Sequence, residues 1–363
     1  MIPAPVTTMD PRRSEGPAPG QPRKPAPAPA AWRRLITVLV LVVAVLICVA
    51  ASLAVGTRPI ALSEVWSALA APIGTDNETV VRTLRVPRTL LGLAVGAALG
   101  LAGALVQGHT RNPLADPGLL GVSAGAAFAV VVAITTTGVS GVLGYVWFSF
   151  AGALAASVLV FGIGAAAAGQ RAATTPVTLA LAGAAVSALL GGLTSALVLV
   201  DTQTLDAYRF WAVGSLAGRG PDVLLPVLPF LVVGALLALA QAPVLNALNL
   251  GADVARALGV RIAWARVVGI AAITLLTGAA VAACGPIAFV GLVVPHVVRT
   301  LVGLDYRWLV PLSGLLGAAL LLAADVAGRV VARPGEVQVG IAVALVGAPF
   351  FIALVRRRRL VAL

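Results

Sequence analysis

Long apolar runs alternate with short polar stretches along most of this chain. A helix that crosses a membrane needs about 20 mostly apolar residues. Runs of that kind predict ten spans, at residues 35–55, 88–107, 118–137, 142–168, 177–200, 223–248, 262–283, 287–304, 308–331 and 338–355. The pattern therefore predicts an all-α polytopic membrane protein with about ten transmembrane helices.

The composition agrees with this class. The chain is 60% hydrophobic and only 10% charged, which excludes an ordinary soluble domain. Residues 1–32 are rich in proline and alanine and lack an apolar period, so they are predicted to form a disordered cytoplasmic tail before a transmembrane domain at 33–359. The run at 35–55 is too long for a signal-peptide core and is predicted to remain as the first span.

Charge placement decides how the segment 287–304 is interpreted. Its apolar part is short, and by itself it could be a re-entrant half-helix. Arginines directly precede the first span and directly follow the last one, so the positive-inside rule predicts that both termini are cytoplasmic. The number of spans is then even, and 287–304 is predicted to cross. This topology places the whole net charge of +12 on the cytoplasmic side of the cytoplasmic (inner) membrane, so no nucleic-acid partner is needed to explain it.

Several kinds of chemistry are missing from the sequence. The single lysine is Lys24, and no G-x-x-x-x-G-K-[ST] motif could cradle ATP phosphates. No catalytic motif is present, and neither His109 nor His296 has a set of neighbouring ligands, so no catalytic residue and no metal site is predicted. The two cysteines imply no disulfide framework.

Ionisable residues near the middle of the spans are also scarce. Asp325 and Arg329 are four residues apart and could pair along one helix. A carrier driven by protons or sodium ions usually needs acidic groups near the membrane midplane. Their scarcity favours transport powered by a partner protein.

Three segments could contact partners or line a pathway. The loop 111–117 is polar and contains two prolines, so it cannot lie in lipid and must sit at the surface or line a protein-lined path. The segment 250–259 is predicted to form a short helix with an apolar face, which could lie on the bilayer or fill a partner's groove. The basic cluster at 82–88 could be solvated or could dock an acidic partner.

Several motifs then resemble one family. The matching stretches are RVPR at 85–88, GAALGLAG at 96–103, RNPLADP at 111–117, LGVSAGA at 120–126, LAG at 181–183, WAVGSL at 211–216, LNLG at 248–251, ARALG at 255–259 and GPIAFVGLVVPH at 285–296. With these motifs the chain resembles the FecCD-type permeases, the membrane subunits of ABC importers for iron–siderophore chelates, haem and cobalamin. The resemblance extends over most of the chain outside the N-terminal tail.

The resemblance implies a helical bundle like that of the permease in the cobalamin importer, which is a type II ABC importer. It also implies that this chain is not an enzyme. It implies four partners besides the lipid bilayer, namely a second permease subunit (a copy or a paralogue), two ABC ATPase subunits and an extracytoplasmic substrate-binding protein. ATP and Mg²⁺ would bind the ATPases, so no cofactor is expected on this chain. The substrate would cross by alternating access without chemical change.

The resemblance also implies roles for individual residues. Those matching the binding-protein docking positions are Arg85, Arg88 and Arg329. Those matching the cytoplasmic gate are Asn112 and Leu114. Those matching the helix that couples to the ATPase are Gly251, Asp253, Ala255, Arg256, Leu258 and Gly259. Gln338 stands where the family usually has proline, so the preceding outer loop is expected to be shaped differently near Arg329.

The resemblance implies an iron–siderophore complex as the expected cargo, because that is the commonest cargo class of the family. Cobalamin and haem remain alternatives on the same scaffold. An ion-coupled secondary carrier and an intramembrane enzyme are alternatives from other classes. The scarcity of midplane acids argues against the first, and the absence of catalytic clusters argues against the second.

Overall fold

The computed structural model describes residues 31–56, 58–71, 74–139, 142–168 and 176–356; the predicted tail, apart from its last two residues, lies outside this description. The described residues form helices and no strands. The helices are α1 (Ala31–Ala54), α2 (Leu62–Ala70), α3 (Asp76–Thr79), the π-helix η1 (Val80–Arg85), α4 (Val86–Thr110), the 3₁₀-helix η2 (Pro117–Leu120), α5 (Val122–Thr137), α6 (Val142–Ala168), α7 (Pro176–Val200), α8 (Thr202–Ala212), α9 (Pro221–Ala240), α10 (Ala242–Asn249), α11 (Ala252–Ala257), α12 (Ile262–Cys284), α13 (Val290–Val302), α14 (Tyr306–Val331) and α15 (Val339–Arg356).

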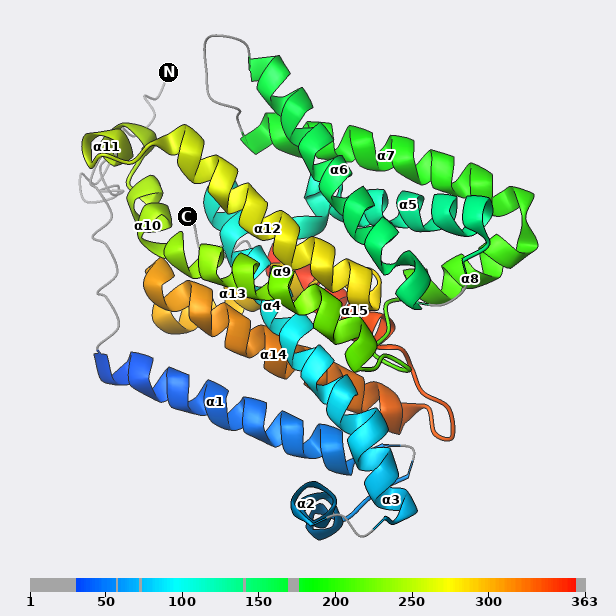
Figure 1. The fold of residues 1–363 in the computed structure, drawn as a ribbon. Helices are drawn as coiled ribbons and strands as arrows, with labels where there is room; N and C mark the ends of the chain where they lie inside the picture. The colour runs from blue at the N-terminus through cyan, green and yellow to red at the C-terminus, as the bar shows by residue number, and fades with distance from the viewer. Residues whose placement is uncertain (1–30, 57, 72–73, 140–141, 169–175, 357–363) are drawn as a thin grey trace, which may run out of the picture.

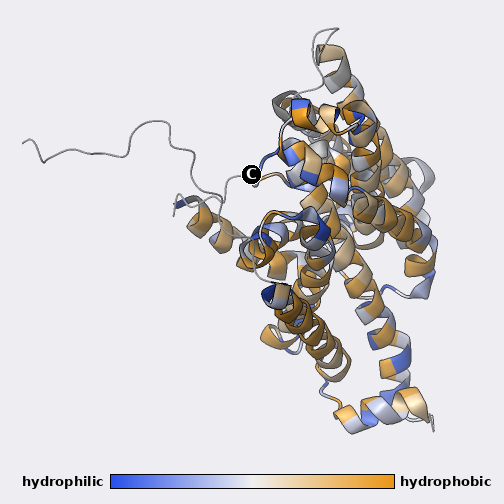
Figure 2. Cartoon of the chain, turned by 90° about the vertical axis from the view of Figure 1, so that its left-hand side faces the viewer, coloured by the Kyte–Doolittle hydropathy of each residue, from blue (hydrophilic) through white to orange (hydrophobic). Residues whose placement is uncertain are grey.

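The bundle confirms the predicted fold class. Within the described chain, seven helices are long and apolar enough to cross a membrane, and three shorter apolar helices, α5, α13 and α15, complete the predicted set. The helices run roughly side by side across the view of Figure 1. Figure 2 shows hydrophobic colour over most helices, with hydrophilic patches mainly at helix ends and loops.

The predicted span 223–248 is wrong as a single helix. Helix α9 ends at Ala240, and α10 begins at Ala242 with proline in its first turn. Pro243 has no N–H and therefore cannot continue the hydrogen-bond ladder of α9. The side chain of Gln241 at the break donates from Nε2 to the Ala265 carbonyl oxygen at 3.1 Å, which ties the bend to α12.

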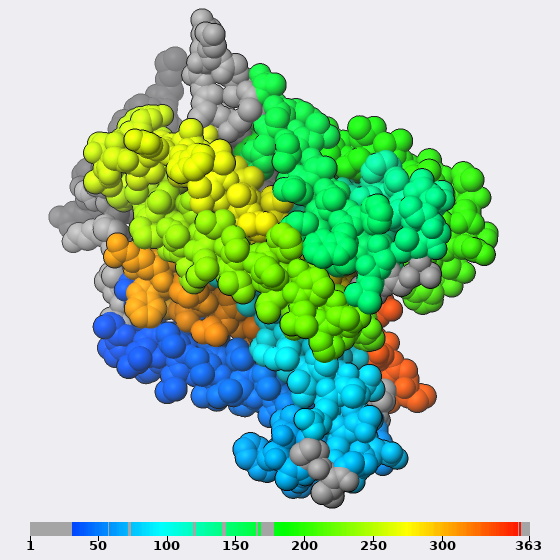
Figure 3. Space-filling view, in the orientation of Figure 1, coloured from blue at the N-terminus to red at the C-terminus, as the bar shows by residue number. Residues whose placement is uncertain are grey.

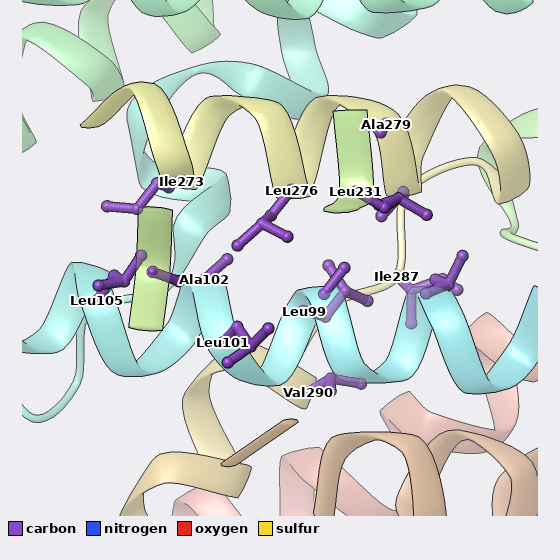
Figure 4. Packing of buried hydrophobic residues seen from close by; sticks show 14 of the residues in the cluster. Leu99, Leu101, Ala102, Leu105, Leu231, Ile273, Leu276, Ala279, Ile287 and Val290 are labelled. Atoms are coloured by element: carbon purple, nitrogen blue, oxygen red, sulfur yellow. The ribbon is translucent and has the colours of Figure 1, made fainter. Parts of the chain in front are cut away.

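Helix α4 lies at the centre of the bundle. It is buried almost continuously from Val95 to Gly108, and it packs against α9, α12, α13 and α14. Figure 4 shows the contact with α12, where Leu99, Ala102 and Leu105 lie near Ile273 and Leu276. On its opposite face α4 closely approaches α14, because a Cβ at Gly100 would overlap the Ser313 carbonyl oxygen. Small residues at this contact let the two helix backbones approach closely.

The bundle has two ends, which we name after the short helices there. The α3 end contains the last turn of α1 together with α2, α3, η1 and α8, and the α11 end contains α10 and α11. The stretch 59–87 between α1 and the body of α4 is largely helical. A capping box between Thr75 and Glu78 starts α3, and the Asp201 side chain caps α8 by accepting from the Gln203 and Thr204 N–H groups.

The segment 285–304 connects the two ends and contains one short helix. Helix α13 has 13 residues, about 20 Å of rise, which is short for a membrane span. Residues 285–289, between α12 and α13, are not helical and complete the passage. Its far end lies at the α11 end, because Asn246 of α10 bonds Asp305 at 2.8 Å and the Tyr306 N–H at 2.8 Å. The segment therefore runs from the α3 end of the bundle to the α11 end, although only part of it is helical, and its crossing of the membrane stays a prediction.

Candidate functional site

A buried charge network joins α1, α4 and α14 at the α3 end. The Asp325 side chain is fully buried and accepts hydrogen bonds from Arg88 Nη2 at 2.8 Å and Arg88 Nε at 3.1 Å. Arg329 Nη2 lies 3.0 Å from the other carboxylate oxygen, which confirms the predicted pair along α14. Arg88 also bonds the half-exposed Glu336 at 2.9 Å. Two arginines are thus neutralised by two acids of this chain.

The remaining donors of Arg329 are directed at α1. Nη1 donates to the carbonyl oxygens of Ser52 and Val55 at 3.0 and 3.1 Å, and Nη2 donates to Ser52 Oγ at 2.9 Å. Ser52 Oγ also shares a 2.7 Å hydrogen bond with Thr89 Oγ1. Because every one of these contacts is buried or nearly so, Arg329 fastens α1 to α14.

Arg85 is buried as well, with different partners. Its Nη1 donates to the Leu53 carbonyl oxygen at 2.6 Å, and its Nη2 donates to the Arg58 carbonyl oxygen. Of the three arginines predicted to dock a binding protein, two therefore share one carboxylate and the third supports the loop after α1. Docking by these residues stays a prediction, and in this structure their side chains have internal partners.

The predicted gate loop 111–117 forms a series of tight turns at the α11 end. Asn112 is exposed, and its Oδ1 accepts the Leu114 N–H at 2.9 Å, while Leu114 itself is half-buried. Asp116 accepts the Gly118 N–H at 2.8 Å and so begins η2. Burial raises the pKa of Asp116, and the Gly118 hydrogen bond opposes that shift. Polar side chains thus satisfy the backbone of a loop that proline prevents from becoming helical.

Helix α11 confirms the predicted short helix at 250–259. Gly251 and Gly259 bracket it with φ of 113° and 83°, conformations that favour glycine over other residues. Ala255 is fully buried against the bundle. Leu250, Val254 and Leu258 are 65%, 44% and 63% exposed, so the apolar face is uncovered in this chain. Asp253 pairs with Arg256 on the exposed side.

The gate loop and α11 are mechanically connected. Arg111 ends α4 in a left-handed conformation, and its Nη2 donates to the Leu248 carbonyl oxygen of α10. Leu248 lies only three residues before Gly251, where α11 begins to turn away. This hydrogen bond links the first residue of the predicted gate loop to the segment just before α11.

A further buried arginine lies on α13, close to the last turns of α4. Arg299 of α13 donates from Nη2 to Gln107 Oε1 at 3.0 Å, and Gln107 Nε2 donates to the carbonyl oxygens of Gly291 and Leu292. Among the described residues Arg299 forms no ion pair, although it is only 2% exposed. Its charge is stabilised by neutral polar groups alone.

Three motifs that are distant in sequence meet at one junction near the α3 end. The Ser215 N–H donates to the Cys284 carbonyl oxygen at 2.8 Å, and the Gly340 N–H donates to the Gly214 carbonyl oxygen at 3.0 Å. A Cβ at Gly214 would overlap the Pro286 carbonyl oxygen, so the backbones touch directly. The junction joins the segments 211–216, 285–289 and 339–341.

An apolar groove of about 650 Å³ runs from this junction along α15. Its walls are Ala212, Val213, Pro286, Ala288, Gly340, Ile341, Ala344, Leu345, Ala348, Pro349 and Ile352. Non-helical backbone at 285–289 forms one wall, and such backbone is tolerated at membrane depth only where protein or a cavity lines it. The sequence contained the motifs but gave no signal that they would share a groove.

Comparison with known proteins now gives the family. The model of the FecCD transport family matches residues 42–357. This chain belongs to the FecCD transport family. As a FecCD member it is a non-catalytic, multi-pass membrane permease subunit of an ABC importer, whose ATPase is a separate subunit.

The relatives of this FecCD permease carry different cargoes. The ferric enterobactin transport system permease protein FepD of Escherichia coli is 47% identical over 326 residues, covering 90% of this chain and 96% of FepD. The cobalamin import system permease protein BtuC of Halobacterium salinarum is 42% identical over 306 residues, covering 82% and 81%. A solved inward-facing structure of a metal-chelate type ABC transporter is 31% identical, covers 89% and 99%, and superposes with a TM-score of 0.77.

Proposed function

We propose that this permease subunit translocates a ferric siderophore complex across the cytoplasmic membrane, using ATP hydrolysed by partner subunits. The observation that carries the cargo class is the 47% identity to the ferric enterobactin permease across nearly the full length of both chains. The apolar groove along α15 supports it, because a chelate whose iron is enclosed by ligand needs a wide path without fixed metal ligands. Among the described residues no group of three or more His, Cys, Asp or Glu could hold a metal ion.

In this proposal the groove is one half of the path. Its open side, with exposed Ile341, Leu345 and Ile352, would face a second permease subunit, either a copy or a paralogue. Substrate would pass between the two subunits. The wall at 285–289 and the small residues of α15 would leave the path smooth and apolar, so that selection rests mostly with the binding protein.

The α11 end would be cytoplasmic, together with both termini. The uncovered apolar face of α11 would insert into a groove on an ABC ATPase that binds ATP and Mg²⁺. Closure of the paired ATPases would move α11. The Arg111–Leu248 contact would pass that movement to Asn112 and Leu114, which would open or close the path.

The α3 end would receive the binding protein. Arg88 is the docking candidate best supported by the geometry, because one of its two acidic partners, Glu336, is half-exposed on a loop. A carboxylate of the binding protein could replace Glu336 without uncovering Asp325. Arg85 and Arg329 would contribute by holding the helix ends that surround this position.

Uptake of radiolabelled iron tests the cargo. Cells without other ferric-chelate permeases would be offered enterobactin, hydroxamate and citrate chelates of iron, with and without this gene. We expect uptake of a siderophore chelate to require the gene. Gene-dependent uptake of labelled cobalamin without uptake of any iron chelate would overturn the siderophore proposal in favour of the cobalamin alternative, which the 42% identical relative supports.

A paired substitution tests the coupling helix in the same assay. Leu258→Asp places a charge on the exposed apolar face of α11, and we expect it to abolish gene-dependent uptake at normal expression. Arg261→Glu, an exposed change just outside α11, is the matched control and should retain most uptake. Full uptake by the Leu258→Asp variant would contradict the role given to α11.

A further inference from the structure

Helix α2 has a face that the protein covers and a face that it does not. The covered face presents Val65 and Ala68, which are 5% and 0% exposed and pack with Ile60 and Val81 in a small cluster. This cluster joins α2 to the end of α1 and to η1. Burial of these side chains explains why α2 stays against the bundle.

The uncovered face of α2 is equally apolar. Leu62, Trp66 and Leu69 are 60%, 72% and 45% exposed. At 3.6 residues per turn their spacing of four and three residues forms one stripe along the helix. This stripe lies next to the covered face, so the protein covers only about half of the apolar surface of α2.

The third face of α2 is polar. Ser67 Oγ donates to the Ser63 carbonyl oxygen at 2.9 Å, and Glu64 accepts from Asn77 Nδ2 at 2.7 Å. The helix therefore separates apolar from polar side chains around its axis, which is the pattern of a helix that lies at a boundary between lipid and water.

The position of α2 matches such a boundary. In Figure 1 α2 is seen end-on while α1 runs across the picture, so the two axes cross steeply, and Figure 3 shows α2 at the edge of the molecule beyond the end of α1. Helix α1 exposes Leu39, Leu46 and Ile47, each more than 60%, as expected for a lipid-facing side. Helix α2 thus lies where that lipid-facing side ends.

We propose that α2 is an interfacial anchor that lies along the phospholipid surface at the α3 end, with Leu62, Trp66 and Leu69 in the membrane. Tryptophan favours this depth because its ring is apolar and its N–H remains near water. The exposed Arg58, four residues before Leu62, is placed to reach lipid phosphate. The lipid surface is favoured over a protein because α2 lies beyond the end of α1, a helix whose exposed side chains are apolar.

The anchor also has a structural consequence. The chain between α1 and α2 supplies the Arg58 carbonyl oxygen that Arg85 bonds. Holding α2 at the membrane surface therefore also holds this loop against Arg85. The inference depends on the membrane fold of the family and is independent of the cargo.

Spin labels on α2 test the inference. Single cysteines at Leu62, Trp66 or Leu69 would be compared with matched cysteines at Ser63 or Ser67, in the full-length chain with Cys48 and Cys284 replaced by alanine. Each variant would be labelled with a nitroxide in nanodiscs of phosphatidylethanolamine and phosphatidylglycerol. Collision with molecular oxygen, which partitions into lipid, would be measured against collision with a water-soluble nickel chelate.

We expect oxygen to dominate at the three stripe positions and the nickel chelate to dominate at both serine positions. Dominance of the nickel chelate at the stripe would place it in water and overturn the proposal. Exclusion of both reagents from the stripe would show that protein covers it, and would overturn the proposal equally. Because the labels sit at exposed positions, folding of the variants is not at stake.

Discussion

The arginines around Asp325 at the α3 end and the buried Arg299 at the α11 end have different partners. At the α3 end Arg88 and Arg329 share the buried carboxylate of Asp325, and Glu336 adds a second acid. At the α11 end Arg299 is buried to the same degree but is bonded to the neutral Gln107. Separating a buried ion pair costs much free energy, because the charges attract strongly in a low-dielectric interior. Breaking a hydrogen bond between an arginine and a neutral amide costs less free energy. The contrast indicates a fixed α3 end and an adjustable α11 end.

Loss of Asp325 should have the largest effect. Asp325→Ala leaves two buried guanidinium groups with fewer counter-charges, and breaking a buried ion pair from one side costs about 3–5 kcal/mol. We expect a marked fall in the thermal stability of the purified protein, measured by size-exclusion chromatography after heating. Asp325→Glu, which keeps the charge, should lose less. Equal stability of the alanine variant and the natural chain would refute the fixed network.

Packing between α4 and α12 gives the next effect. A Cβ at Gly269 would overlap the ring of His109, so Gly269→Ala should destabilise the bundle by about 1–3 kcal/mol through overpacking. Replacing His109 with alanine in the same chain removes the clash. After heating, the double variant should therefore keep more folded protein than the Gly269→Ala variant. Equal losses in the two variants would mean that the clash with His109 is not the cause of the destabilisation.

The amide at the α11 end should matter less for stability than for transport. Gln107→Ala removes the hydrogen bond to Arg299 and leaves two carbonyl oxygens without their donor, at a cost of about 1–3 kcal/mol. We expect a moderate loss of thermal stability together with a clear loss of uptake. Full uptake by the Gln107→Ala variant, despite lower stability, would contradict a role of the Arg299–Gln107 contact in transport.

Glu336→Gln should have the smallest effect on stability. Its side chain is 32% exposed, and an ion pair of that exposure contributes about 0–1 kcal/mol. The substitution frees one face of Arg88, so the proposed docking role predicts tighter binding of the cognate binding protein in a pull-down from nanodiscs. Weaker binding would mean that Glu336 itself contacts the partner.

The sequence predicted some parts of the fold well, for physical reasons. Spans follow from run length, because lipid requires about 20 apolar residues in a helix. Helix α11 was predictable because its glycines and apolar face are local. The α9–α10 break was not predicted, because Gln241 and Pro243 are short interruptions of a stretch whose average hydropathy still indicates one span.

Long-range contacts could not be predicted from the sequence. Arg88 meets Asp325 across 237 residues, and Arg329 meets Ser52 across 277. A cluster of arginines along the sequence indicates a surface, and only the folded bundle shows that Arg85 and Arg88 have internal partners. The junction of the segments 211–216, 285–289 and 339–341 could not be predicted either. Its motifs are far apart in the sequence and form part of a groove only after the helices pack.

Distances between spin-label pairs test the central claim, that the α11 end moves while the α3 end stays fixed. One pair would be placed at the exposed positions Ala257 and Thr300, and the other at Arg58 and Gly335, in the cysteine-free chain assembled with its ATPases. Pulsed electron resonance would compare the nucleotide-free state with the ATP-bound state. We expect a shifted distance distribution for the first pair and an unchanged distribution for the second. An unchanged first pair, or a shift confined to the second, would contradict the claim.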